Sequence, residues 1–316
     1  MTNINAEISR LTNKDVKIRR RAVRALFEED DASALRGFVK LLDDSDFWFR
    51  NKALDAHRKW AKSPEELEPL MANNKQVVAE LLQKIPAPEI AKSLLEEEDN
   101  VIRSFAAKSL SKSTDLHSRF AKDEHHSVRI VAAENSEDLE LLSSLISDKH
   151  AAVRRAAIST ASSNQMDLGE DTLKIGLDSN DPALRSLVAS LAVKYGGDIF
   201  EMACKDNDPK VRKSIADTLR TDVDKVDSRI ETAADICPEI IVRWLRSKYD
   251  KDASLLRWSM IENTSLNSRL RSKLIEQMEG RGDTDQERLA AILEDSSNLV
   301  KIAAQNLSQS IQELEG

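Results

Sequence analysis

The stretch Asp208–Ala216, DPKVRKSIA in one-letter code, contains the pattern that decides the fold of this chain. It starts with an acid, has an apolar residue directly before an Arg, and has apolar residues three and four positions after that Arg. Val211 and Ile215 are four positions apart, so on an α-helix they lie on one face. Asp208 stands where a side-chain oxygen can accept hydrogen bonds from the free N–H groups of a starting helix. The stretch therefore predicts a capped helix with one apolar packing face.

The pattern occurs eight times, and the Arg of each copy, replaced once by Lys, serves here as a reference position. An apolar residue always precedes the reference residue, and Ala, Val or Ile follows three positions later. Four positions before it stands Asp in five copies, His in two and Ser in one. Each copy is therefore expected to open a helix. The eight reference residues are Arg19, Arg50, Arg103, Arg129, Arg154, Arg185, Arg212 and Lys301.

The repeating unit extends backwards to a second helix. Eight positions before each reference residue the chain is apolar again, as at Leu42 and Ile146, and these residues end the apolar stretches 34–42 and 139–146. The unit is thus helix, short polar turn, helix. Reference residues are 25 to 31 positions apart, except for two longer gaps that fit two and three units, with degenerate copies near 77–81, 241–245 and 270–274. About eleven helix pairs would fill the chain, which predicts an all-α fold, an α-α superhelix in which pairs bury their faces by stacking.

The motif Asp-x-x-Val-Arg-x-x-Ala-Ala, as in residues 208–216 or 150–158, resembles the HEAT repeat, and the short units between Asp99 and Ala161 also resemble the leucine-rich variant repeat. The resemblance covers nearly the whole chain and implies one continuous HEAT-like solenoid over residues 1–316. Within it we expect basic N-terminal units (1–63), central short units (64–239) and C-terminal units (240–316). The resemblance implies little about activity, because the family includes scaffolds, transport receptors, lyase subunits and a few enzymes.

Composition agrees with a helical protein. The chain has 8 Gly and 7 Pro in 316 residues and 32% charged side chains. No run approaches the roughly 20 apolar residues of a membrane span, and the first residues lack the layout of a signal peptide, so we expect a cytoplasmic protein. Cys204 and Cys237 do not have the spacing of a metal site, and Cys204 fills a packing position. The tripeptide Arg-Gly-Asp at 281–283 is interpreted as a helix end followed by a helix start, not as an adhesion motif.

The charge is uneven. The whole chain has a formal net charge of -8, which disfavours a dedicated nucleic-acid binder. Residues 1–63 nevertheless carry 14 Lys and Arg against 10 Asp and Glu, so a cationic end is joined to an anionic body.

The first candidate site is N-terminal. It comprises cations of the first repeat helix and two Trp of the second unit, one of which, Trp48, is expected to be partly exposed. An exposed Trp beside cations is typical of an anchor for a protein partner or a stacked base. The alternative is that the Trp residues cap the solenoid and the Arg residues are only solvated. The candidate residues are Arg20, Arg21, Arg24, Trp48 and Trp60.

The second candidate site is the stretch 240–274, which holds eight Lys and Arg against three Asp and Glu, with aromatic residues interleaved. Arg243 and Arg246 are one helical turn apart and could clamp phosphates or acidic side chains. The alternative is that the Trp residues, which sit within apolar runs, belong to the core. The candidate residues are Arg243, Trp244, Arg246, Arg257 and Trp258.

Histidines and the row of reference arginines are weaker candidates. His125, His126 and His150 are close to one repeat apart, which could place imidazoles near each other for a metal, but His125 and His150 occupy the helix-start position and no further ligand motif completes a shell. No metal or cofactor is therefore predicted. Acids such as Asp44 and Asp123 lie six positions before a reference residue, so we expect Asp–Arg contacts between successive turns and not a phosphate track.

Catalytic signatures are absent from the sequence: it has no Gly-rich phosphate loop and no Gly-x-Ser-x-Gly elbow. HEAT-like hydroxylases need repeated His-Glu dipeptides, which are lacking, and HEAT-like alkylpurine DNA glycosylases are smaller and basic. We therefore expect a non-enzymatic scaffold that binds a protein partner along its solenoid surface. The alternatives are a nucleic-acid-binding solenoid with base-excision chemistry and an accessory subunit of a lyase complex. The sequence indicates no small-molecule substrate and no membrane partner.

Overall fold

The computed structural model describes residues 3–281 and 284–315, and in this part of the chain the regular elements are α-helices and short 3-10 helices, with no strand. The all-α solenoid prediction is confirmed. The packing of Cα atoms divides the chain into two compact units, residues 1–141 and 142–316. Each is described by itself, and the prediction of one continuous solenoid with three segments stays a prediction. Gly282 and Asp283, from the Arg-Gly-Asp tripeptide, lie outside the described residues.

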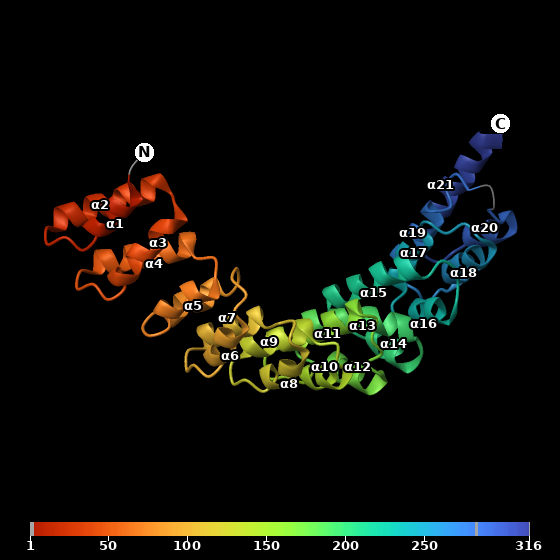
Figure 1. Cartoon of the computed structure of the whole chain (residues 1–316). Helices are drawn as coiled ribbons and strands as arrows, with labels where there is room; N and C mark the ends of the chain where they lie inside the picture. The colour runs from red at the N-terminus through yellow and green to blue at the C-terminus, as the bar shows by residue number, and fades with distance from the viewer. Residues whose placement is uncertain (1–2, 282–283, 316) are drawn as a thin grey trace. The chain divides into compact units, whose positions relative to one another are not determined.

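The first unit consists of helix pairs that follow one another along the chain (Figure 1). The pairs are α1 (Ile4–Arg10) with α2 (Val16–Glu29); η1 (Ala32–Ala34), α3 (Leu35–Phe38) and η2 (Val39–Leu41) with α4 (Phe47–Trp60); η3 (Pro64–Glu66) and η4 (Glu68–Leu70) with α5 (Lys75–Leu81); α6 (Pro88–Leu94) with α7 (Asn100–Ser109); and η5 (Thr114–Leu116) and α8 (His117–Phe120) with α9 (His126–Asn135). The second helix of each later pair packs on that of its neighbour: α5 contacts both α4 and α7, and α7 contacts α9.

The second unit continues the same arrangement. Helix α10 (Leu139–Leu145) crosses the division between the units and is followed by α11 (Ala151–Ser163). The later pairs are α12 (Glu170–Leu177) with α13 (Pro182–Tyr195); α14 (Gly197–Cys204) with α15 (Pro209–Asp222); α16 (Ser228–Ile236) with α17 (Pro238–Leu245); α18 (Lys251–Glu262) with α19 (Ser268–Glu276); and α20 (Gln286–Ile292) with α21 (Asn298–Glu315). Figure 1 shows α11, α13, α15, α17, α19 and α21 following one another along one side of this unit, and each packs on the next. In chain order the described helices make the eleven pairs that the repeat spacing predicts.

The predicted helix-start residues cap the helices. The carboxylate of Asp208 accepts a hydrogen bond from the N–H of Lys210 at 2.8 Å, and Asp99 accepts one from Val101 at 2.8 Å. In the two histidine copies Nδ1 takes the place of the carboxylate oxygen: His125 and His150 each accept an N–H at 3.3 Å. The histidines are therefore capping residues, as their position in the repeat predicts.

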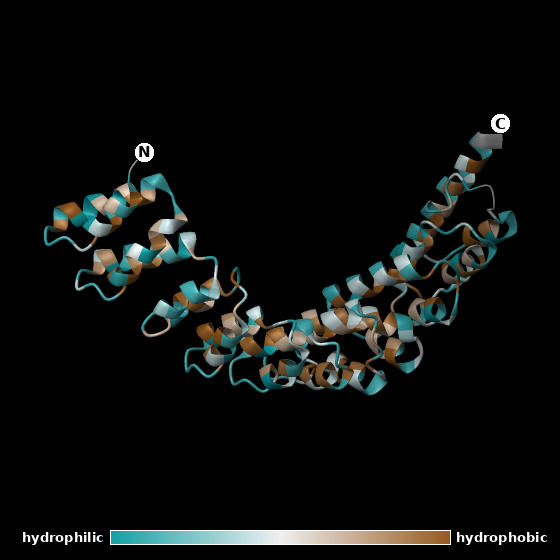
Figure 2. Ribbon diagram, viewed as in Figure 1, coloured by the Kyte–Doolittle hydropathy of each residue, from teal (hydrophilic) through white to brown (hydrophobic). Residues whose placement is uncertain are grey.

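The apolar stripe forms the core of each unit. Residues three positions after the reference residue are buried in all eight copies, and residues directly before it are buried in seven. The exception is Ile18, which is exposed on α2 together with Val16. In Figure 2 apolar and polar residues alternate along the helices, as this packing requires.

The reference arginines connect each helix pair to the next pair along the chain, which confirms the predicted Asp–Arg contacts. Arg103 Nη1 donates to the carbonyl oxygens of Glu97 and Glu98 at 2.8 Å, while Nε and Nη2 donate to the Asp123 carboxylate of the next unit at 2.9 and 3.0 Å. Arg185 makes the same bridge to Asp206. Burial of the Asp123 carboxyl raises its pKa, but hydrogen bonds from Arg103 and from a backbone N–H outweigh burial and leave the pKa below its ordinary value.

The two cysteines meet in the core of the second unit. Cys204 at the end of α14 and Cys237 at the end of α16 are both buried, and their thiols interact. The hydrogen bond with Cys237 and burial both raise the pKa of the Cys204 thiol. A buried, protonated thiol is a packing residue and a poor nucleophile, as predicted for Cys204.

Candidate functional site

Three of the predicted aromatic contacts are core residues. Trp244 is 1% exposed and donates its indole N–H to the carbonyl oxygen of Val223 at 2.9 Å. Trp258 is buried between the helices of the second unit. Trp60 is buried against Phe27 and donates its indole N–H to Asp30 at 2.9 Å. These enclosed rings cannot reach a partner, and we withdraw Trp60, Trp244 and Trp258 from the candidate partner-binding residues.

Arg257 is withdrawn for a similar reason. It is buried, and its Nη2 donates to the carbonyl oxygens of Leu245 and Lys248 at 2.8 and 3.0 Å. It therefore holds the end of the preceding helix, as the reference arginines do elsewhere. The apolar runs around Trp244 and Trp258 in the sequence indicated the core alternative, and that alternative is correct.

The N-terminal candidates are partly brought together. The guanidinium of Arg20 on α2 lies 5.4 Å from the ring centre of Trp48 on α4 and pairs with Asp46 at 3.3 Å. Trp48 is half-buried, with its ring edge-on to Phe49. Arg21 and Arg24 are exposed on α2. Arg20 thus contacts both the Trp48 ring and the Asp46 carboxylate, whereas Arg21 and Arg24 are exposed to solvent.

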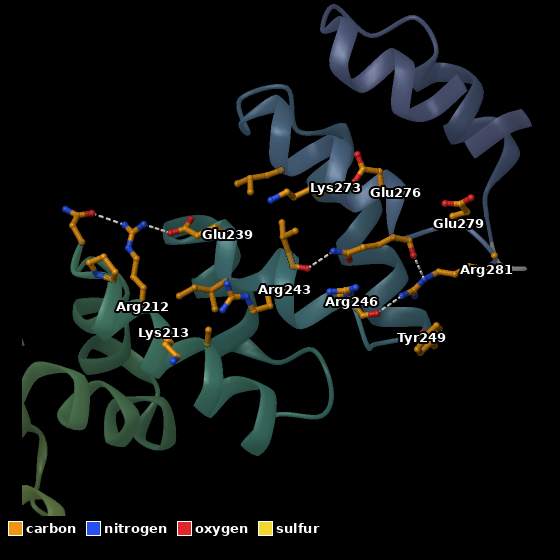
Figure 3. Close-up of a pocket in the computed structure, with 18 residues that line it drawn as sticks. Arg212, Lys213, Glu239, Arg243, Arg246, Tyr249, Lys273, Glu276, Glu279 and Arg281 are labelled. Atoms are coloured by element: carbon orange, nitrogen blue, oxygen red, sulfur yellow. Dashed lines mark hydrogen bonds and ion pairs between the residues drawn. The ribbon is translucent and has the colours of Figure 1, made fainter. Parts of the chain in front are cut away.

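The C-terminal candidates Arg243 and Arg246 line a groove in the second unit, shown in Figure 3. The groove has a volume of about 920 Å³ and is formed by α15, α17, α19 and the turns at their ends. Its charged lining residues are six cations and three acids. They are Arg212, Lys213, Arg243, Arg246, Lys273 and Arg281, with Glu239, Glu276 and Glu279. A chain of net charge -8 therefore concentrates an excess of positive charge here. We call this feature the cationic groove.

Two of the six cations are fixed by the protein itself. Arg212 donates to the carbonyl oxygen of Asp206 at 2.9 Å and forms an ion pair with Glu239. Arg281 donates to the carbonyl oxygens of Lys248 and Arg246 at 2.7 and 3.1 Å. Its guanidinium also lies 4.1 Å from the ring centre of Tyr249, so it covers one face of that ring. These contacts hold both guanidinium groups in place, and the Arg212 charge is paired with Glu239.

The other four cations are exposed, and within residues 3–281 and 284–315 their side chains make no hydrogen bond or ion pair. They are Lys213 on α15, Arg243 and Arg246 at the end of α17, and Lys273 on α19. The walls that carry them are linked, because Nε2 of Gln277, the residue directly after α19, donates to the carbonyl oxygen of Val242 on α17 at 3.0 Å. Four unpaired cations on three neighbouring helices give this part of the groove a positive electrostatic potential.

The groove is lined mainly by charged and polar side chains. The described lining contains Arg, Lys, Glu, Gln, Asn and Tyr but no His, Cys, Ser or Asp. Glu276 and Glu279 stand at the α19 end of the groove together with the cations Lys273 and Arg281. The side formed by α15 and α17 contributes four cations against one acid, so the excess of positive charge is largest there. These residues are Arg212, Lys213, Arg243 and Arg246, with Glu239.

Sequence reasoning missed Lys213 and Arg281 as groove residues. Lys213 directly follows the reference residue Arg212, and Arg243 follows Val242, which holds the reference position of the degenerate copy 241–245. Aligning the copies would have placed Lys213 and Arg243 on the same face of neighbouring helices. No sequence signal places Arg281, whose partners lie 33 and 35 residues earlier.

The histidines do not assemble a metal centre. His125 and His126 have ring centres 4.4 Å apart, and His125 Nδ1 is hydrogen-bonded to Ser127. Among the described residues no group of three or more His, Cys, Asp or Glu side chains is arranged to hold a metal ion. In that same part of the chain none of the helices combines the length and the apolar character needed to cross a bilayer.

Comparison with known proteins gives weak similarities. No protein-family model matches the chain, and no curated protein matches it. Among solved structures, an engineered protein from the Northeast Structural Genomics Consortium is 17% identical, with 99% of each chain covered and a TM-score of 0.41. The Escherichia coli protein YibA is 13% identical over 98% of this chain and 93% of its own, with a TM-score of 0.34. A designed armadillo repeat protein in complex with a (KR)4 peptide is 15% identical over 98% and 99%, with a TM-score of 0.21.

Proposed function

We propose that the protein is a non-catalytic, HEAT-like interaction scaffold that binds an acidic segment of a protein partner in the cationic groove. The observation that carries this proposal is the set of four exposed, unpaired cations on α15, α17 and α19. Repeat helices present such residues on a pre-shaped surface, so a partner can bind without reorganising the scaffold. The HEAT assignment rests on the Asp-x-x-Val-Arg motif and on the helix pairs that it opens.

An acidic segment suits the groove electrostatically. Unpaired cations close together repel one another, and an incoming carboxylate relieves that repulsion while forming charge-assisted hydrogen bonds with the guanidinium groups. Arg243 and Arg246 are the strongest candidates for such bonds, because a guanidinium can hold a carboxylate through two parallel hydrogen bonds. Lys213 and Lys273 extend the positive field to the neighbouring helices.

A peptide suits the groove better than a nucleic acid does. Glu239, Glu276 and Glu279 lie in the same lining and would repel an unbroken phosphate backbone, whereas a peptide can place neutral or basic residues beside them. Base stacking has little support in the groove, because Trp244 and Trp258 are buried and Arg281 covers one face of Tyr249, which leaves only the other face of that ring for a base.

The test is a fluorescence-anisotropy titration with a labelled Glu- and Ser-containing peptide of about twelve residues, long enough to cross three helices at about 3.3 Å per residue and 8–10 Å between axes. Arg243→Glu with Arg246→Glu should weaken binding at least about tenfold, because two attractive charges become repulsive. Arg21→Glu with Arg24→Glu is the matched control, since it changes the net charge equally on exposed residues of α2. Equal losses in both variants, or no peptide binding, would contradict the proposal.

The nucleic-acid alternative is an outcome of the same titration. Single- and double-stranded DNA and RNA are titrated at about 50 and 200 mM salt, where phosphate contacts lose affinity steeply. Tighter binding of a nucleic acid than of the acidic peptide, with loss in the Arg243→Glu, Arg246→Glu variant, would replace the protein-binding proposal.

A further inference from the structure

A second, smaller hollow adjoins the cationic groove. It has a volume of about 170 Å³, lies between α19 and α21, and is lined on its apolar side by Ile275, Leu299, Ile302 and Leu307. Leu299 and Ile302 are 44% and 55% exposed, although the apolar residues Val300 and Ala304 on the same helix are buried. They stand one helical turn apart, so α21 presents two neighbouring apolar side chains at the rim of a hollow.

The hollow and the cationic groove share part of their lining. Glu276 and Glu279 line both of them, so α19 forms the shared wall. Moving from α15 to α21, a bound chain would meet first the unpaired cations, then the two shared acids, and last the apolar hollow. The surface along α15, α17, α19 and α21 therefore offers a bound chain three chemically distinct binding positions.

We propose that one extended segment of the partner occupies both sites, with acidic residues over the cationic groove and a large apolar side chain in the hollow between α19 and α21. This inference rests on the proposed function and specifies the sequence that the groove selects. Residues between the acids and the apolar side chain are neutral or basic, because they pass Glu276 and Glu279.

The helix spacing sets the distance between the cationic groove and the apolar hollow. Arg243 lies on α17 and Ile302 on α21, two helices further along the row. Neighbouring helix axes are about 8–10 Å apart, and an extended chain advances about 3.3 Å per residue, so about five or six residues separate the acid bound at Arg243 from the apolar residue. The chain direction is set by the partner, so the apolar residue follows the acids in one direction and precedes them in the other.

The test compares labelled peptides that share one acidic block and differ elsewhere. One carries Ser throughout the remainder, one carries Leu about five residues after the block, one carries Leu about five residues before it, and one carries Leu directly beside it. One of the two distant placements should bind about tenfold tighter than the Ser peptide, because a Leu side chain leaves water. Leu directly beside the block should give no gain.

The matched variant is Leu299→Ser with Ile302→Ser, which changes exposed side chains and should leave the fold intact. It should remove the Leu advantage and leave the affinity for the Ser peptide unchanged. Equal affinities for the Leu and Ser peptides, or an advantage that survives in the variant, would overturn the inference while leaving the proposed function standing. Failure of every acidic peptide to bind would overturn the proposed function itself.

A second copy of this chain is the competing occupant of the hollow. Sedimentation velocity of the wild type and of the Leu299→Ser, Ile302→Ser variant separates the two cases. Self-association of the wild type that the variant abolishes would assign the hollow to a second copy and overturn the inference. A wild type that stays monomeric while the Leu peptide binds is the expected result.

Discussion

The bridge from Arg271 to Asp295 is the most enclosed of the Arg–Asp contacts. The Arg271 side chain is 2% exposed and that of Asp295 is 6% exposed. Arg271 Nε also donates to the carbonyl oxygen of Ile261 at 2.6 Å, so one guanidinium holds the end of α18 and the turn before α21. Removing one partner of such a pair leaves the other charge buried without compensation.

We therefore expect Arg271→Met to lower the free energy of unfolding by about 3 kcal/mol, measured by urea denaturation followed by circular dichroism. The control is Lys205→Met, which breaks an exposed ion pair with Glu201 and should change stability by less than about 1 kcal/mol. Similar losses in the two variants would show that the Arg271 contacts carry no special weight.

The aspartates in these bridges make stability depend on pH. Hydrogen bonds from Arg271 hold the pKa of Asp295 below its ordinary value of 3.8. Burial raises the pKa of Asp206, but hydrogen bonds from Arg185 and from a backbone N–H outweigh burial, so this pKa is also below its ordinary value. A carboxyl whose pKa is lower in the folded state stabilises that state above the unfolded pKa, and the contribution is lost as pH falls through the folded pKa.

The free energy of unfolding should therefore decrease as pH falls below about 4. The decrease should be smaller in an Arg103→Met variant, because Asp123 then loses the hydrogen bonds that lower its pKa. The measurement is urea denaturation at a series of pH values for both proteins. Parallel pH dependence in the two would contradict the role assigned to the Arg103 bridge.

At the scale of single residues, sequence reasoning placed Arg243 and Arg246 together on the surface, as the structure does, but misplaced Trp244 and Trp258, which are buried. The cations were found because clusters of Lys and Arg are visible in one stretch of sequence. The tryptophans were misplaced because an apolar run covers every face of a helix, so periodicity does not say which side is buried. The position of Arg281 was not predicted, because this residue is held by backbone carbonyl oxygens, and such contacts leave no pattern in a sequence.

At the scale of helices, capping is the link from sequence to element. The Asp208 side chain caps α15, and Pro209 at the first helical position fits the same start. Asp208→Ala should lower the free energy of unfolding by about 1 kcal/mol, because an N–H group of the first turn loses its partner. Lys210→Ala, two residues along on the exposed surface, is the control and should be nearly neutral. An unchanged unfolding midpoint for Asp208→Ala would contradict the capping role.

The helices themselves were largely predictable. Each full copy of the motif corresponds to a second helix, and the degenerate copies 77–81, 241–245 and 270–274 correspond to α5, α17 and α19. The first helices of the pairs were less visible, since several are short 3-10 and α segments such as η3 and η4 that carry no long apolar period. The division between Leu141 and Leu142 had no sequence signal, because the repeat runs through it without a break.

At the scale of the whole molecule, a repetitive core carries a local cluster of exposed positive charge. Most Arg and Asp side chains of the motif pair with each other or with backbone groups and maintain the stacking of units. Exposed cations such as Arg21 and Arg24 occur elsewhere too, but on α15, α17 and α19 four cations with no partner among the described residues line one groove. Departures from a structural repeat that leave charge uncompensated are where binding is expected.

The most direct test of this account locates the bound peptide on the scaffold. A Glu- and Ser-containing peptide with a photoreactive residue at its centre is irradiated with the full-length protein, and the cross-linked residues are identified by mass spectrometry. We expect cross-links to α15, α17 and α19 that disappear in the Arg243→Glu, Arg246→Glu variant and persist in the Arg21→Glu, Arg24→Glu variant. Cross-links confined to α2 and α4, or spread evenly over the helices of both compact units, would contradict this expectation.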